Sequence, residues 1–115
     1  MSLGLSREER LMKTYQFLQI KAQGLSIRAK PFWIQARLEL EGPCKLGIIA
    51  TKRLGNAAAR NRAKRLIREL FRRNKHKLPR ALGMVVLPRR SILKTPFHEL
   101  ETLFIDALFK ASNRL

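Results

Sequence analysis

The sequence predicts an α+β fold in which helices pack on one small sheet, with elements in the order α-β-β-α-β-α. Two kinds of pattern lead to this class. Two segments, in the middle and at the end of the chain, carry apolar stripes typical of amphipathic helices, and a third near the start has apolar residues followed by a glycine stop. Short apolar or alternating runs bounded by Gly and Pro lie between them, which is typical of strands. The length of 115 residues suits a single domain over 1–115.

The first half of the chain is expected to hold one helix and two strands. Residues 1–12 are expected to be flexible, and a helix over about 14–23 should end at Gly24. Partial alternation over 32–41 predicts a half-buried strand, and the Gly42-Pro43 turn follows it. The apolar run within 45–53 predicts a second strand, antiparallel to the first.

The second half is expected to hold a helix, a strand and a last helix. The helix should cover about 57–74, and an apolar, β-branched strand should follow over 82–87. Thr95 is predicted to cap the last helix, with Pro96 at its first position and its end near Ser112.

The basic segment 52–75 is the clearest indication of function. Ten of its 24 residues are Lys or Arg, and Glu69 is its one acidic residue. A solvated helix face normally mixes signs to gain ion pairs four residues apart, so this excess indicates a polyanionic partner. The whole chain has a net charge of +17, which agrees with RNA binding. The same segment has an apolar stripe that should dock it on the core, formed by Ala59, Ala63, Leu66, Ile67, Leu70 and Phe71.

The sequence offers no self-contained catalytic chemistry. The eight acidic residues form no recognisable metal-binding group, the two histidines are expected to be solvated, and no phosphate-binding loop of the GxxxxGK type occurs. We therefore expect no catalytic residue and no metal ligand. Cys44 is expected to be a buried small hydrophobe. No apolar run is long enough for a membrane span and no secretory signal is recognisable, so a cytoplasmic location is expected.

One segment is similar to a known family. Its elements are Lys52-Arg53-Leu54-Gly55-Asn56, Arg60-Asn61-Arg62, Lys64-Arg65 and Arg68-Glu69, and it closely resembles the signature of the protein subunit of bacterial ribonuclease P. The resemblance implies a cofactor of the RNA-based endoribonuclease, a hydrolase that removes the 5′ leader from precursor tRNA. It also implies a catalytic RNA partner, Mg²⁺ at the RNA active site, and no cofactor bound by the protein itself.

The resemblance also extends the predicted fold to an α-β-β-(β)-α-β-α sandwich with a four-stranded sheet. The additional short strand would lie near Ile27 or just before Asn56. The family's β-α-β crossover around the basic helix is left-handed, which is an exception to the right-handed rule.

The resemblance implies two sets of contact residues. A cleft between the first helix and the sheet would receive the single-stranded leader, and its positions here are Phe17, Lys21, Gln35, Arg60, Asn61, Lys64 and Arg68. Contacts to the catalytic RNA are implied for Lys52, Arg53, Asn56, Arg62, Arg65 and Arg72. Lys21 and Gln35 stand where the family often has aromatic residues, so this cleft should rely more on phosphate contacts and hydrogen bonds than on stacking.

Several alternatives stay open from the sequence. Phe17 could be a core aromatic, Asn56 could cap the basic helix instead of contacting RNA, and Trp33 could serve the core or RNA equally well. For the whole chain, the main alternative is a ribosomal or other structural RNA-binding protein. A lone enzyme lacks the required carboxylates, and a DNA-binding helix would have to leave the sheet to enter a major groove.

Overall fold

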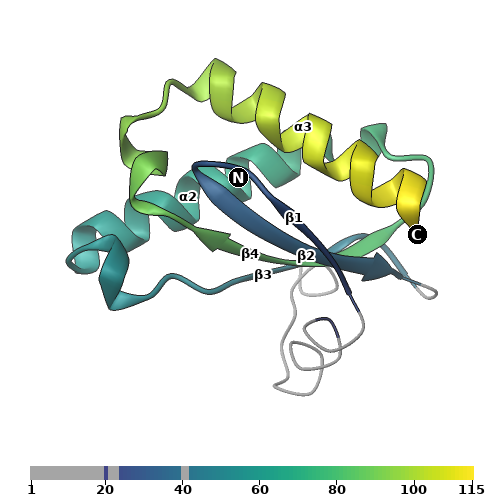
Figure 1. Cartoon of the computed structure of the whole chain (residues 1–115), viewed down its shortest axis with the longest axis horizontal. Coiled ribbons are helices and arrows are strands. Elements are labelled where there is room, and N and C mark those ends of the chain that lie inside the picture. The colour runs from purple at the N-terminus through teal and green to yellow at the C-terminus, as the bar shows by residue number, and fades with distance from the viewer. Residues whose placement is uncertain (1–19, 21–23, 40–41) are drawn as a thin grey trace.

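Four strands form one mixed sheet, with two long helices lying against it (Figure 1). The computed structural model describes Ile20, residues 24–39 and residues 42–115. The strands and helices are β1 (Leu25–Arg28), β2 (Phe32–Leu38), β3 (Lys45–Ile48), α2 (Ala57–Asn74), β4 (Leu82–Pro88) and α3 (Phe97–Arg114). The helix predicted over about 14–23 lies outside the described residues, apart from Ile20, and so do Phe17 and Lys21.

The strand order is β1-β2-β4-β3. β2 pairs antiparallel with both β1 and β4, whereas β3 pairs parallel with β4. The prediction that β3 would be antiparallel to the preceding strand is right for its direction, but the two strands are not neighbours. β4 lies between them, because α2 carries the chain back to start a strand parallel to β3. The additional strand implied near Ile27 is β1, and the left hand implied for the crossover stays a prediction.

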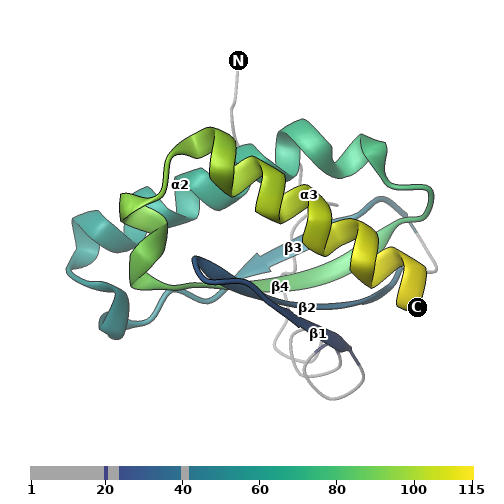
Figure 2. The ribbon, with the colours of Figure 1, turned by 45° about the horizontal axis from the view of Figure 1, so that its top comes forward.

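The two faces of the sheet differ in whether α2 and α3 pack on them. Along β2, the side chains of Phe32, Ile34 and Ala36 are completely buried on one face, as the partial alternation predicts. Both α2 and α3 lie over this face, which we call the covered face (Figures 1 and 2). Trp33 and Gln35 belong to the opposite face, which we call the open face, and both are half-buried.

β3 ends earlier than the sequence predicts. It stops at Ile48, and residues Lys52–Leu54 form a short 3-10 turn, η2. β4 runs one residue further than predicted and includes Pro88 as its last residue. Ile20 is buried on the open face against Val85.

The last helix starts later than predicted. Thr95 does not cap it, because its hydroxyl donates to the Ser91 carbonyl at 2.7 Å within the preceding 3-10 turn η4 (Arg90–Lys94). Pro96 occupies the cap position, and its carbonyl accepts from the amides of Glu99 and Leu100. The helix then continues to Arg114, two residues beyond the predicted end. None of the helices in the described part of the chain is both long and apolar enough to cross a membrane.

Candidate nucleic-acid interface

The start of α2 is fixed by two local hydrogen bonds and one backbone conformation. The Asn56 side-chain oxygen accepts from the Ala59 amide at 2.9 Å, so the cap interpretation of Asn56 is confirmed. Gly55, just before it, has a φ of 146°, a conformation that residues with a Cβ rarely adopt. Arg60 donates to the Gly55 carbonyl at 3.4 Å. The conformation of the segment that resembles the family signature is therefore determined by its own residues, and RNA contact by Asn56 stays a prediction.

The apolar side of α2 docks on the covered face. Ala63, Ile67, Leu70 and Phe71 are completely buried, which confirms the predicted stripe and moves Phe71 from its edge to its centre. Ala59 and Leu66, expected on the same stripe, are only half-buried. The docking determines which cations of α2 face solvent.

The first part of α2 presents cations without carboxylate partners. Arg62, Arg65 and Arg68 are exposed, and Arg60 and Lys64 are half-buried. Among the described residues, no Asp or Glu forms an ion pair with any of these five side chains. Asn61 is also exposed in this part of the helix. The surface is suited to phosphate groups, because nothing in the described chain neutralises it.

The last part of α2 is different, because its cations have partners. Arg72 forms an ion pair with Glu69, and Arg73 pairs with Glu101 of α3 at 3.0 Å. The hydrogen bond from Arg72 lowers the pKa of the Glu69 carboxyl below its ordinary value, and the same bond raises the pKa of Arg72. Arg72, which the resemblance assigns to the catalytic RNA, is thus already paired within the protein.

Asn74, at the end of α2, is a buried polar residue that the sequence patterns did not single out. Its side-chain nitrogen donates to the Leu70 carbonyl at 2.8 Å and to Glu101 at 3.1 Å. Glu101 of α3 therefore joins the two helices through Asn74 and Arg73. An Asn closing a helix is a weak local signal, and its partner is 27 residues away in the chain.

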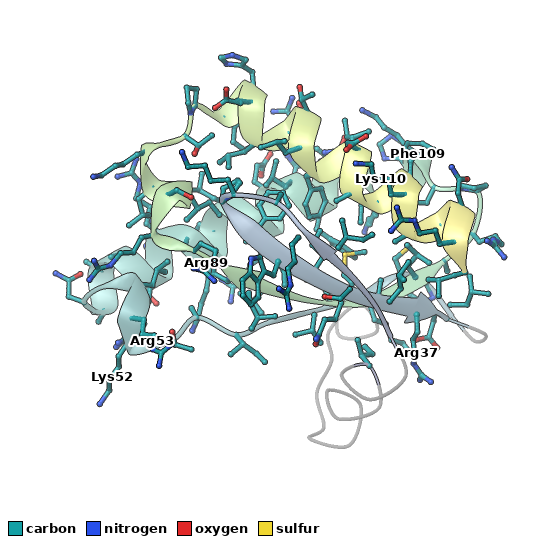
Figure 3. The ribbon with its side chains drawn as sticks, in the orientation of Figure 1. Arg37, Lys52, Arg53, Arg89, Phe109 and Lys110 are labelled. Atoms are coloured by element: carbon teal, nitrogen blue, oxygen red, sulfur yellow. The ribbon has the colours of Figure 1, made fainter. Side chains whose placement is uncertain are left out.

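Lys52 and Arg53 lie in η2, next to the start of α2, and both are exposed. Figure 3 shows them together at one end of the molecule, with Arg37 of β2 at the opposite end of the sheet. The two cations extend the basic surface of α2 beyond the helix, and their contact with the catalytic RNA stays a prediction.

Gln35 is separated from the helix residues with which the resemblance groups it. It lies on the open face, whereas Arg60, Asn61, Lys64 and Arg68 belong to α2, which packs on the covered face. Within the described ranges no hydrogen bond joins Gln35 to α2, and its side-chain oxygen is buried without a hydrogen-bond partner. The described residues therefore do not by themselves bring the proposed cleft residues together.

Trp33 lies on the open face between two arginines. The guanidinium carbons of Arg28 and Arg89 lie 4.3 and 4.5 Å from its ring centroid. A half-buried indole with two cation contacts is a surface residue, so the core alternative for Trp33 is wrong. Sequence reasoning missed Arg28, Arg89 and Arg90. The alternation of β2, which places Trp33 beside Gln35, and the basic pair directly after β4 were the available signals.

Metal binding by the described part of the chain would need several suitable side chains brought together. No group of three or more His, Cys, Asp or Glu side chains there could hold a metal ion. Cys44 is buried, as predicted, and its sulfur accepts from the Leu82 amide at 3.4 Å.

Comparison with known proteins gives consistent matches. The family model described as Ribonuclease P matches residues 5–112. The Ribonuclease P protein component of Thermotoga maritima is 36% identical over 92 residues, which cover 80% of this chain and 79% of that protein. The component of Desulfosudis oleivorans is 29% identical over 111 residues, covering 96% and 92%.

Solved structures agree with the sequence matches. The RNase P protein from Thermotoga maritima superposes with a TM-score of 0.78 at 31% identity, covering 89% of this chain and 96% of that one. The RNase P protein from Staphylococcus aureus gives a TM-score of 0.74 at 28% identity, covering 89% and 93%. The α+β class predicted from the sequence is confirmed.

Proposed function

This chain belongs to the ribonuclease P family, and we propose that it is the protein subunit of the RNA-based endoribonuclease that removes the 5′ leader from precursor tRNA. The observation that carries the proposal is a family match over 5–112 that includes the first part of α2, whose cations have no carboxylate partner among the described residues. In this role the protein binds a catalytic RNA subunit and the leader, and the holoenzyme acts in the cytoplasm.

The division of labour follows from the chemistry of the chain. Hydrolysis of a phosphodiester with metal ions needs ligands that hold them a few ångströms apart. The described residues supply cations for phosphates rather than carboxylates for metals. Mg²⁺ would therefore be held by the RNA, and the protein would position the RNA and the substrate.

Two surfaces divide the binding in this proposal. The catalytic RNA contacts the exposed cations around the start of α2, namely Lys52, Arg53, Arg62 and Arg65, with Asn56 between them. The leader contacts Gln35 and the cleft residues of α2, together with Phe17 and Lys21. Support comes from the described residues: no Asp or Glu among them pairs with the named cations of η2 and α2, and the side-chain oxygen of Gln35 has no hydrogen-bond partner.

Reconstitution tests the function directly. Cleavage of a precursor tRNA by the catalytic RNA of a bacterial ribonuclease P should be strongly accelerated by this protein at low Mg²⁺ concentration. The protein without RNA should cut nothing. Acceleration no greater than that by a basic ribosomal protein of similar size would instead support the alternative, a structural RNA-binding protein, and cleavage by RNA-free protein would refute the division of labour.

Salt dependence measures the phosphate contacts. If about six phosphates of a single strand are neutralised, the logarithm of the binding constant should fall with the logarithm of salt concentration with a slope near −4. A filter-binding titration that gave a slope shallower than about −2 would contradict a basic patch of this size.

Phe17 tests the leader site separately. If Phe17 stacks on a leader base, Phe17→Ala should cost about 1–3 kcal/mol of affinity for substrates with a long leader and almost nothing for substrates without one. A core role predicts instead a loss of stability of about 3–5 kcal/mol and no dependence on leader length. Holoenzyme affinity against leader length, with a thermal melt of the protein, separates the two roles.

A further inference from the structure

One end of the open face carries a row of three residues from three strands. Arg37 of β2, Gly83 of β4 and Lys45 of β3 are paired across the sheet. Laterally paired residues point to the same side, and Arg37 shares the side of Gln35 two residues before it, so the row belongs to the open face. Figure 3 shows Arg37 at the end of the sheet that lies away from Arg89. The row is thus at the opposite end of the face from η2 and η4.

The carboxylate of Glu39 lies over the middle of this row. Its Oε1 is 3.4 Å from the Nζ of Lys45, and its Oε2 would be only 3.2 Å from a Cβ at Gly83. Glycine at this strand position therefore leaves room for the carboxylate to approach the sheet. The Glu39 amide also donates to the Ala81 carbonyl at 2.9 Å. With 11% of its side chain exposed, Glu39 is held at both its backbone and its carboxylate.

Glu39 differs in place from the other carboxylates of the described residues. Those belong to α2 and α3, which pack on the covered face: Glu69, Glu99, Glu101 and Asp106. Among the described residues, Glu39 is therefore the one carboxylate on the open-face side of the sheet. It is also less exposed than any other carboxylate that forms an ion pair in the described ranges. A carboxylate is seldom buried unless it is paired, and the charge of Glu39 is balanced by Lys45.

The pair occupies a place that would suit a phosphate oxygen. A lysine ammonium binds carboxylate and phosphate oxygens alike, and backbone without a Cβ allows either to come close. In the next row of the open face, the side-chain oxygen of Gln35 is buried without a hydrogen-bond partner. Beyond Gln35, Lys45 is already neutralised by Glu39. At the far end, by contrast, Arg28 and Arg89 have no carboxylate partner among the described residues.

We propose that Glu39 determines where the leader leaves the open face, because it occupies the phosphate position at Lys45 and so excludes a leader phosphate from it. The inference rests on the proposed function, which brings a single-stranded leader to Gln35. The contacts proposed for the catalytic RNA, at Lys52 and Arg53, lie at the other end of the sheet, so the leader enters from there and runs toward Glu39. Its phosphates meet cations first and a carboxylate at the end.

The length of this path follows from the strand. Arg37 follows Trp33 by four positions in β2, which corresponds to about 13 Å. A stacked strand advances by about 3.4 Å for each nucleotide, so this distance accommodates about four nucleotides, and fewer if the strand is extended. Leader nucleotides beyond this number should add little to the affinity of the wild-type protein.

Glu39→Gln tests the proposal, because it keeps the size of the side chain and leaves Lys45 without its carboxylate. The measurement is the affinity of the reconstituted holoenzyme for precursor tRNAs with leaders of increasing length. The affinity of the wild type should stop rising at about four nucleotides. That of the variant should rise further and gain about tenfold for the longest leaders, whereas leaderless substrates should bind both proteins equally. For long leaders, the log–log salt dependence should become steeper by about 0.7, the value for one more phosphate of a single strand.

Asp106→Asn is the matched control. Asp106 pairs with Lys110 at 3.0 Å on α3, so its loss also removes one negative charge and leaves one lysine unpaired, but away from the open face. This variant should keep the wild-type dependence on leader length. Equal gains for Glu39→Gln and Asp106→Asn would reduce the effect to net charge and refute the proposal.

A double variant, with Glu39→Gln and Lys45→Gln, separates the lysine site from simple relief of repulsion. It returns the net charge to that of the wild type and removes the cation that would bind the added phosphate. The gain for long leaders should therefore disappear, and a gain that persisted would refute the phosphate position at Lys45. Should Glu39→Gln melt too low for assembly, Lys45→Gln alone is the test: the carboxylate stays, so long leaders should bind more weakly and leaderless substrates as before. Unchanged binding of long leaders would refute the proposal.

The same experiment distinguishes the role of Glu39 from the proposed function. A holoenzyme that cleaves, with the same leader-length dependence in wild type and Glu39→Gln, would refute the role of Glu39 and leave the function standing. A loss of stability with no change in that dependence would make the ion pair purely structural and refute the proposal as well. A wild-type protein that fails to accelerate cleavage would refute the function, and the path of the leader with it.

Discussion

The first and last parts of α2 are both rich in basic residues, but the partners of these residues differ. From Arg60 to Arg68 the cations face solvent with no carboxylate partner among the described residues, whereas Arg72 and Arg73 pair with Glu69 and Glu101. The first part therefore keeps its charge for a ligand, and the last part uses its charge to hold α2 against α3. A high count of basic residues in a helix is thus not a measure of its binding surface; the partners of each cation decide.

The largest loss of stability should come from truncating a residue of the buried apolar stripe, which runs through both parts of α2. Ile67→Ala should cost about 2–5 kcal/mol of stability, because Ile67 is completely buried beneath the cations. Leu66→Ala should cost less, since Leu66 is only half-buried. Denaturant unfolding of both variants measures the difference. A larger loss for Leu66→Ala would show that the docked side of α2 is wrongly assigned.

In the last part of α2, loss of the buried side-chain amide of Asn74 should lower the stability of the protein. Asn74→Ala would remove the side-chain donor that joins the Leu70 carbonyl to Glu101, although Arg73 still pairs with Glu101, and should cost roughly 1–3 kcal/mol of stability. Asn113→Ala, at an exposed position of α3, is the control. Thermal melts that gave the same small change for both variants would mean that the contact between α2 and α3 does not depend on Asn74.

Substitutions of the cations in the first part of α2 should weaken RNA binding and have little effect on the stability of the fold. Arg68→Ala and Lys64→Ala should each weaken RNA binding by roughly 1–3 kcal/mol, with little change in melting temperature. Arg72→Ala should weaken it less, because Arg72 is already paired with Glu69. Filter binding and melts of the same three variants test this. Equal affinity losses at positions 64, 68 and 72 would remove the distinction between the two parts.

The smallest effect on stability should come from breaking the exposed ion pair between Glu69 and Arg72. The pKa of Glu69 is lowered in the folded protein, chiefly by the hydrogen bond from Arg72, so its small contribution to stability is present above its ordinary pKa of 4.5. This contribution is lost as the pH falls through the lowered pKa of the folded state. Glu69→Gln should therefore lower the melting temperature slightly at neutral pH and not at all in sufficiently acidic buffer. The same substitution frees Arg72, so RNA affinity at neutral pH should rise; a fall in affinity would contradict the pairing argument.

Much of the fold could be predicted because the signals are local. The bounds predicted for the basic helix, about 57–74, agree with those of α2, since its cap and apolar period each involve residues within a few positions of one another. The burial of alternate residues along β2 was predictable for the same reason. The start of α3 was predicted one residue too early, because Thr95 bonds to η4 instead, a competing interaction that a cap pattern does not reveal.

The candidate site was predictable only as a list of cations. The excess of Lys and Arg over acids in 52–75 indicated a polyanionic partner, because one glutamate within the segment cannot neutralise ten cations. Which cations are free depended on the tertiary structure: Arg73 meets Glu101, and Arg28 and Arg89 meet at Trp33. It also decided that β3 pairs with β4 and not with β2. These contacts join residues tens of positions apart, and their free energy depends on how the helices and strands pack, which no local pattern of residues encodes.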